Sequence, residues 1–383
     1  MTTTPPPRTP RSRRADAHRS ATRALAAVAT ALLGAGVLAA CGSSDGATGA
    51  GSAGQDGDGP SVVASTSVYA DIARQVAGEN ATVESVISDP TADPHSYEAS
   101  PADAARVATA DLVVYNGGGY DSFVDLALEN AGEVPVVRAV DEFARVTGEA
   151  VPAHTHDHGA HAGQDDDSGH DDHAGDDDHA GQGNHASKDA HAEHDDHAHA
   201  SGINEHVWFH LPTTAAVAEQ VANQLAELDP ENADEYRANA ESFGDALTPL
   251  EAQVDQIHDR GHFAYAQTER IGAHLFDAAH LVDETPRGFL SSVEDDADPS
   301  AADLTAMLDL LQEREVSFLA YNSQTETGVT SRVRGAAEEA GVVVVDLTET
   351  LPDDTDYLTW ITDIVGDLAA ALDGATPVDD DDH

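Results

Sequence analysis

A stretch of 46 residues near the middle of the chain, 154–199, cannot contribute to a hydrophobic core. It holds 12 histidines and 12 aspartates but no valine, isoleucine, leucine, methionine or aromatic residue. Without large apolar side chains to bury, such a segment cannot offset the entropy lost on folding, and we expect it to be disordered without a ligand. The folded part of this 383-residue chain must therefore be built from the segments on either side.

The segment before this tract alternates short apolar runs with amphipathic stretches. The apolar runs predict strands over 61–65, 82–87, 111–115 and 134–137. The amphipathic stretches predict helices over 68–76, 101–110 and 122–130. Strands that alternate with helices are typical of a parallel sheet with helices on its faces.

The same alternation returns after the tract. Strands are predicted over 263–268, 317–321 and 342–346. Helices are predicted over 271–279, 301–314, 331–340 and 356–372. We therefore predict an α/β fold with two lobes, each a small parallel sheet flanked by helices.

A long helix is predicted between the two lobes, over 232–259. Its apolar residues recur at helical intervals: Tyr236, Phe243, Leu247, Leu250, Val254 and Ile257. About 28 helical residues span roughly 40 Å, which is long enough to join two lobes. Pro249 falls inside this pattern and is expected to kink the helix.

The N-terminal segment reads as an export signal. A basic stretch is followed by the uncharged segment Ala24–Ala40, which is too short for a comfortable membrane span of ~20 residues. It ends at Cys41, the only cysteine, and Leu38-Ala39-Ala40-Cys41 resembles the bacterial lipobox. We expect an extracytoplasmic protein that is held to the membrane by a lipid on Cys41. The general secretory and twin-arginine export routes both stay open.

These patterns divide the chain into six parts. They are a signal peptide over 1–40, a flexible tether over 41–60, an N-terminal α/β lobe over 61–230 that carries the 154–199 insert, a linking helix over 231–260, a C-terminal α/β lobe over 261–373 and an acidic tail over 374–383.

Charge and cysteine content exclude several classes of function. The chain has 71 acidic and 18 basic residues, a formal net charge of −53. Nucleic-acid binding needs clustered Lys and Arg, so we expect no nucleic-acid partner. A single cysteine rules out an intramolecular disulfide and any cysteine-based zinc or iron–sulfur site. The chemistry of this protein must be carried by imidazole and carboxylate groups.

The histidine-rich tract itself allows three interpretations. Its imidazoles and carboxylates suit the collection of zinc, nickel or copper ions. Its histidines also titrate near pH ~6.5, which suits a pH sensor. The third interpretation is a solvated spacer. The composition favours metal collection, because short His-rich tracts typically bind metal.

Four candidate metal ligands outside the tract are placed just after predicted strand ends. They are His95, His206, Glu269 and Glu326. Ligands of open α/β folds bind at the carboxyl ends of strands, so a cleft between the lobes could collect all four. Two imidazoles and two carboxylates satisfy a four-coordinate divalent ion. Each residue alone also has an ordinary explanation as a packed histidine or a solvated glutamate.

Catalysis is not expected from this set of residues. The sequence contains no evident nucleophile with a paired base, and four protein ligands leave no open position for an activated water on a metal. We therefore predict that the protein is not an enzyme.

Several motifs around these residues carry a family resemblance. They are DPHSYE around His95, EHVWF around His206, AQTE with Glu269, YNSQTET with Glu326, and the later ETLP that begins at Glu349. Together with the lipobox and the His-rich insert, they resemble the zinc/manganese solute-binding lipoproteins of bacterial ABC transporters. The resemblance covers roughly residues 61–372.

The resemblance implies two α/β lobes joined by a long rigid helix, with one metal ion in the cleft. His95 and His206 match the family's first two histidine ligands, Glu269 falls where members carry His or Glu, and Glu326 falls where manganese-type members carry Asp. It also implies a monomer that delivers a divalent ion to an ABC permease and its ATPase.

The choice of metal rests on two conflicting signals. The His-rich tract favours zinc, because imidazole-rich sites bind zinc more tightly than manganese. The paired glutamates keep manganese as the alternative. A further alternative is a surface zinc buffer or adhesion lipoprotein, which would need the tract but not the cleft.

Overall fold

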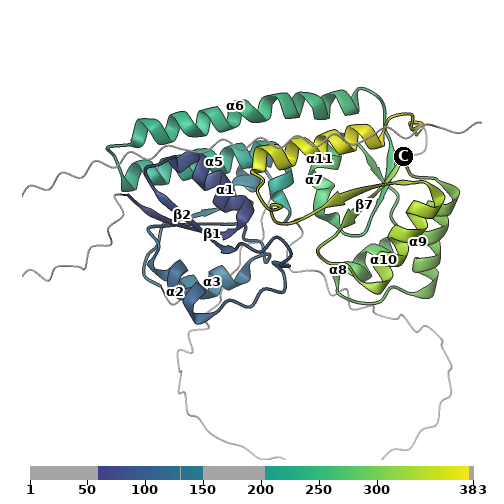
Figure 1. Cartoon of the computed structure of the whole chain (residues 1–383), viewed down its shortest axis with the longest axis horizontal. Coiled ribbons are helices and arrows are strands. Elements are labelled where there is room, and N and C mark those ends of the chain that lie inside the picture. Colours follow the sequence, from purple (N-terminus) through teal and green to yellow (C-terminus); the bar gives the residue numbers. More distant parts are fainter. Residues whose placement is uncertain (1–58, 130, 150–202, 379–383) are drawn as a thin grey trace, which may run out of the picture. The chain divides into compact units, whose positions relative to one another are not determined.

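The structure is a computed structural model that describes residues 59–129, 131–149 and 203–378 (Figure 1). The predicted signal peptide, Cys41, the histidine-rich tract, most of the tether and half of the acidic tail lie outside these residues. Both sheets described below belong to one compact unit. No helix within the described ranges is long and apolar enough to cross a membrane.

The first sheet has four parallel strands in the order β2-β1-β3-β4. They are β1 (Ser61–Thr66), β2 (Thr82–Ile87), β3 (Leu112–Tyr115) and β4 (Val136–Arg138). The helices are α1 (Ser67–Ala77), α2 (Pro101–Thr109), α3 (Ser122–Glu129) and α4 (Ala139–Thr147). Alternate residues of β1 pack on opposite faces, Val62 with the core that includes α1 and α4, and Val63 with α2 and α3. A strand buried on both faces carries consecutive apolar residues rather than an alternating pattern, as β1 does over Val62, Val63 and Ala64.

The second sheet repeats this topology, with parallel strands in the order β6-β5-β7-β8. They are β5 (Ala264–Gln267), β6 (Val282–Asp283), β7 (Phe318–Asn322) and β8 (Val343–Leu347). The surrounding helices are α7 (Ala273–Ala278), α8 (Arg287–Glu294), α9 (Ala301–Glu313) and α10 (Gly328–Ala340). Phe318 packs with α7, whereas Leu319 faces α9 and α10. The predicted α/β class with two small parallel sheets is confirmed.

Three long helices share the larger core. They are α5 (Leu211–Leu228), α6 (Ala233–His258) and α11 (Tyr357–Ala371). Helix α6 lies against α5 and α11 and also packs on α1 and α7, so it contacts elements around both sheets (Figure 1). Its six predicted apolar positions are all buried. The helix runs through Pro249 without interruption, with the proline on its exposed side.

Some predicted elements needed correction. The helix expected over 271–279 begins as the short 3₁₀ turn η2 (Arg270–Gly272) before α7, and the helix expected from 331 begins three residues earlier, in α10. A second 3₁₀ turn, η1 (Val207–Phe209), precedes α5. Helices α4, α5 and α8 and strand β6 were not predicted from the sequence.

Candidate metal centre

Three side chains from distant parts of the chain converge in the structure. They are His95 from the loop after β2, His206 at the start of η1, and Glu349 just after β8. One ligand atom from each lies within 4.8 Å of the others. The His95 and His206 rings meet edge to face, with centroids 5.7 Å apart. The group therefore draws on both sheets, at the carboxyl ends of their strands.

His206 presents one ring nitrogen to this group with its lone pair free. Its Nδ1 lies 2.7 Å from Oδ1 of Asn204, so Nδ1 carries the proton and donates it. Nε2 is then an acceptor, and it is buried with no hydrogen-bond partner among the described residues. A buried polar atom without a partner is costly and calls for an explanation. A hydrogen bond on the other ring nitrogen is the usual way in which proteins orient a metal-binding histidine.

Burial sets the protonation of His206. The residue is only 6% exposed, and removal of the ring from water disfavours the charged imidazolium. This lowers the pKa of His206 to about 3, although the charge of Glu349 opposes the shift. At neutral pH the ring is therefore a neutral base, the form that binds a metal ion.

His95 behaves in the opposite way. Burial alone would lower its pKa, but the contact with Glu349 outweighs burial and raises the pKa of His95 to about 9. Its Nε2 lies 3.3 Å from Oε2 of Glu349, and the His95 side chain is 38% exposed. The pair is an imidazolium–carboxylate contact at neutral pH.

Glu349 is the buried carboxylate of the group. It is 1% exposed, and Oε2 accepts no well-aligned hydrogen bond from the described residues. Burial acts to raise its pKa, but the contact with His95 prevails and the pKa of Glu349 is lowered. Its Oε1 accepts a hydrogen bond of 2.8 Å from Nδ2 of Asn322. The carboxylate is thus ionised and fixed in orientation.

Glu269 lies next to this group through a shared partner. The same Nδ2 of Asn322 donates to Oε2 of Glu269, and the hydroxyl of Thr325 donates to Oε1. Burial raises the pKa of Glu269 to about 7. Its carboxylate feels the charges of both Glu349 and His95. The structure therefore brings Glu269 beside the three converging side chains.

Glu326 is placed differently from the sequence-based expectation. It is exposed, and its Oε2 accepts a 2.8 Å hydrogen bond from the Tyr321 hydroxyl. The physical reason is its distance from the strand end. By Glu326 the chain has left β7 and is about to enter α10, which is capped by Thr327. Glu326 is not part of the converging group, and Glu349 occupies the place of a second carboxylate.

Glu349 was not singled out from the sequence as a ligand. The signal was present, because Glu349 follows a predicted strand and opens the ETLP motif. The same rule that selected Glu269 and Glu326, a carboxylate after a strand end, applies to Glu349 as well. With several glutamates after strands, the sequence does not say which of them turn inward.

Gln324 holds the His95 loop against the second sheet. Its Nε2 donates to the backbone carbonyls of Pro90 and Ala92, at 2.9 and 3.1 Å. Its Oε1 accepts from the backbone N–H of Glu349. One side chain thus connects the loop that carries His95 with the segment that carries Glu349.

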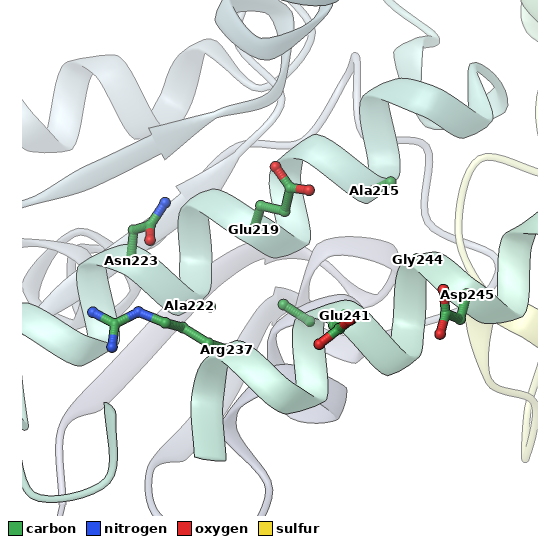
Figure 2. Close-up of a pocket in the computed structure, with 9 residues that line it drawn as sticks. Ala215, Glu219, Ala222, Asn223, Arg237, Glu241, Gly244 and Asp245 are labelled. Carbon is green, nitrogen blue, oxygen red and sulfur yellow. The ribbon is translucent and has the colours of Figure 1, made fainter. Parts of the chain in front are cut away.

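A groove elsewhere on the described surface lacks converging histidine and buried carboxylate side chains. It lies between α5 and α6 and is lined by small and charged residues (Figure 2). They are Ala215, Glu219, Ala222, Asn223, Arg237, Ala240, Glu241, Gly244 and Asp245. This groove contains none of the candidate ligands.

Two parallel sheets of the same topology, with buried imidazole and carboxylate groups converging at their strand ends, define a binding protein of the α/β class. A family model agrees. Residues 62–371 match the periplasmic zinc-uptake complex component A, ZnuA, and the chain belongs to this family. The family is one of solute-binding receptors rather than enzymes, as the sequence predicted.

Relatives of this chain carry names for two metals. This chain is 25% identical over 290 residues to the manganese-binding lipoprotein MntA of Bacillus subtilis, and the match covers 74% of this chain and 78% of MntA. It is 23% identical over 272 residues to the zinc-binding lipoprotein AdcA of Streptococcus pneumoniae, covering 70% of this chain and 46% of AdcA. The match to MntA of Halalkalibacterium halodurans, at 26% identity, spans 55% of that protein.

Solved structures show the same fold. The periplasmic zinc-binding protein TroA of Treponema pallidum superimposes with a TM-score of 0.59 at 17% identity. The match covers 82% of this chain and 99% of TroA.

Proposed function

We propose that this chain is the extracytoplasmic metal receptor of an ABC importer. It captures a zinc ion with His95, His206, Glu349 and Glu269 and delivers it to a membrane permease that is driven by an ATPase. A lipid on Cys41 holds it to the membrane, and it acts as a monomer. The observation that carries the proposal is the buried, unpartnered Nε2 of His206 beside the carboxylate of Glu349.

Zinc fits this donor set. Two imidazole nitrogens and carboxylate oxygens are common ligands of four-coordinate zinc. The His-rich tract over 154–199 adds twelve imidazoles, and such ligands bind zinc more tightly than manganese. Manganese is the second candidate, because carboxylates suit it and several relatives are named for it.

Paired glutamate substitutions test the ligand set. The chain lacking 154–199 is titrated with zinc and with manganese against a chelator of known strength. Glu349→Gln should weaken binding at least 100-fold, because it removes the buried anionic ligand and leaves a neutral amide. Glu326→Gln, a matched change of an exposed glutamate after another strand, should leave affinity within about twofold.

The outcome of this pair decides between two ligand sets. Loss of affinity in Glu326→Gln but not in Glu349→Gln would refute the assignment and restore the set predicted from sequence. Tighter binding of manganese than zinc by the unsubstituted protein would overturn the choice of metal while leaving the receptor role in place.

A surface zinc buffer or adhesion lipoprotein is the alternative role. It depends on the tract and not on His95. A strain that carries His95→Ala as its sole change should grow poorly on chelated medium if the protein is a receptor. Normal growth of that strain would favour the buffer.

A further inference from the structure

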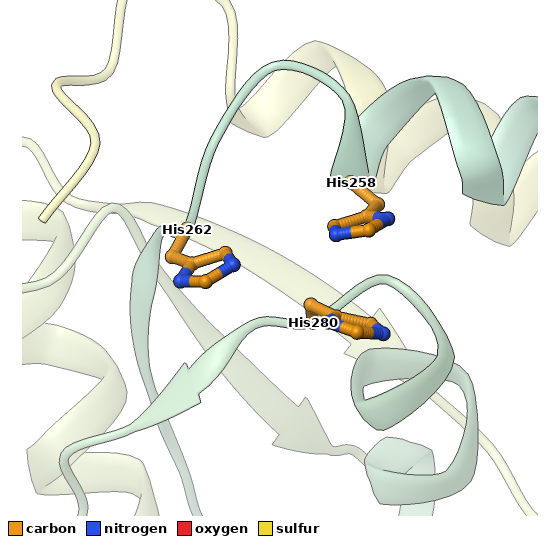
Figure 3. Close-up of side chains that lie close together, drawn as sticks. All are labelled: His258, His262 and His280. Atoms are coloured by element: carbon orange, nitrogen blue, oxygen red, sulfur yellow. The ribbon is translucent and has the colours of Figure 1, made fainter. Parts of the chain in front are cut away.

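A second group of histidines lies apart from the candidate receptor site. His258 is the last residue of α6, His262 lies just before β5, and His280 lies in the turn between α7 and β6. One ring nitrogen from each lies within 4.8 Å of the others. Figure 3 shows the three rings grouped where these segments meet.

The rings already lie close to one another. His258 and His280 stack with centroids 3.9 Å apart, and each lies 6.1 Å from the His262 ring. A metal ion lies in the plane of the imidazole that binds it, at about 2.0–2.1 Å for zinc. Rotation about the side-chain bonds of His258 and His280, which would separate the two stacked rings, would turn the three nitrogens toward one ion. His280 is exposed and the other two are half-buried, so the group is open to solvent.

The backbone at His280 adds a second observation. Its φ is +53°, in the left-handed region where glycine or asparagine is the usual residue after a helix. Its N–H donates to the carbonyl of Asp277, which closes the end of α7. A side chain kept in this unfavourable conformation points to a use for the imidazole itself.

The turn between α6 and β5 places His262 close to the end of α6. Gly261 has φ +115°, and an added Cβ there would lie 3.0 Å from Pro377. The backbone carbonyl of His262 accepts a 2.8 Å hydrogen bond from Val378. His262 is therefore held where its ring reaches the end of α6.

We propose that His258, His262 and His280 form a second metal site, which binds a divalent transition ion of the zinc class and is separate from the cargo site. Three imidazoles and no sulfur suit zinc, nickel or copper far better than manganese. Water fills the remaining coordination position. The bound ion cross-links the end of α6 to the edge of the second sheet. The net charge of −53 raises the local concentration of cations around the chain.

The test uses the complete mature chain. Crystals grown with zinc are measured on both sides of the zinc absorption edge, so that anomalous scattering locates each ion. We expect a peak within about 2.3 Å of a ring nitrogen of each histidine. In solution, His280→Gly should lose one tightly held zinc equivalent per chain, and His258→Asn and His262→Asn should do the same.

A matched control separates metal binding from backbone relief. Asp296 also has a positive φ, +52°, so Asp296→Gly relaxes the backbone without removing an imidazole. It should keep every zinc equivalent. With chelator present, His280→Gly should unfold at the same temperature as the unsubstituted chain or higher, which shows that it folds. The absence of an anomalous peak at the three rings, or retention of all zinc equivalents by the three variants, would overturn the proposal.

Discussion

His95 and His206 face the same carboxylate, yet their pKa values shift in opposite directions. His206 is buried and neutral, with a pKa of about 3, whereas the contact with Glu349 raises that of His95 to about 9. At neutral pH the protonated His95 ring therefore supplies the positive charge beside the Glu349 carboxylate, where a metal ion would otherwise lie. An incoming metal ion must displace this proton before it can bind both residues.

Metal affinity should therefore rise with pH. Between pH 7 and pH 9 it should fall about tenfold for each unit that the pH decreases, since one proton is displaced from His95. Below pH 7 the slope should steepen, because Glu269, with a pKa of about 7, also binds a proton. His206 should not contribute. Chelator competition at pH 8, 7 and 6 measures the slope.

The control for this dependence is His95→Ala. It should bind metal more weakly at every pH and should lose the dependence above pH 7. An affinity of the unsubstituted protein that stays constant between pH 6 and pH 8 would contradict the protonation states described for the site.

At the scale of the element, Gln324 joins two segments that carry ligands. Its amide donates to two carbonyls of the His95 loop and to the hydroxyl of Thr350, and accepts from the N–H of Glu349. A half-buried amide with four such bonds is costly to remove, because its partners lose their hydrogen bonds.

Gln324→Ala should lower both stability and metal affinity. We expect the free energy of unfolding to fall by about 1–3 kcal/mol, as for the loss of buried hydrogen-bond partners. Urea unfolding in the presence of chelator measures it. Gln256→Ala is the control, because Gln256 is exposed on α6 and bonds only locally to Ala252 among the described contacts. Equal effects of the two substitutions would contradict a role for Gln324 in joining the loops.

Most elements could be read from the sequence because apolar periodicity reports burial directly. Strands buried on both faces, such as β1 and β7, stand out as short apolar runs. Helix α5 could have been found from Val217, Val221 and Leu225, which are spaced four apart. Strand β6 could not, since its two residues are too few to show a period.

The candidate site was harder to predict than the fold. The strand-end rule identified His95, His206 and Glu269, which the structure brings together, but it also selected Glu326. Whether a glutamate after a strand turns inward depends on hydrogen bonds to distant residues, as with Asn322 and Glu349. Such partners are far apart in the chain, and a local pattern does not contain them.

At the scale of the whole molecule, the site depends on contacts between the two sheets. Ser67 after β1 accepts from the backbone of Leu351 through its hydroxyl, and Asp71 of α1 accepts from the backbone of Tyr357. His95 belongs to the first sheet's loops and Glu349 to those of the second. An ion held by His95 and Glu349 would therefore connect both halves.

The most direct test compares metal content and competitive affinity with and without residues 154–199. We expect the chain without the tract to keep one tightly bound zinc ion, and His206→Ala in that chain to lose it, because the substitution removes the buried Nε2. The intact chain should hold additional, weaker ions. If the chain without the tract binds neither zinc nor manganese, or if His206→Ala keeps its ion, the receptor site is not the group of His95, His206 and Glu349.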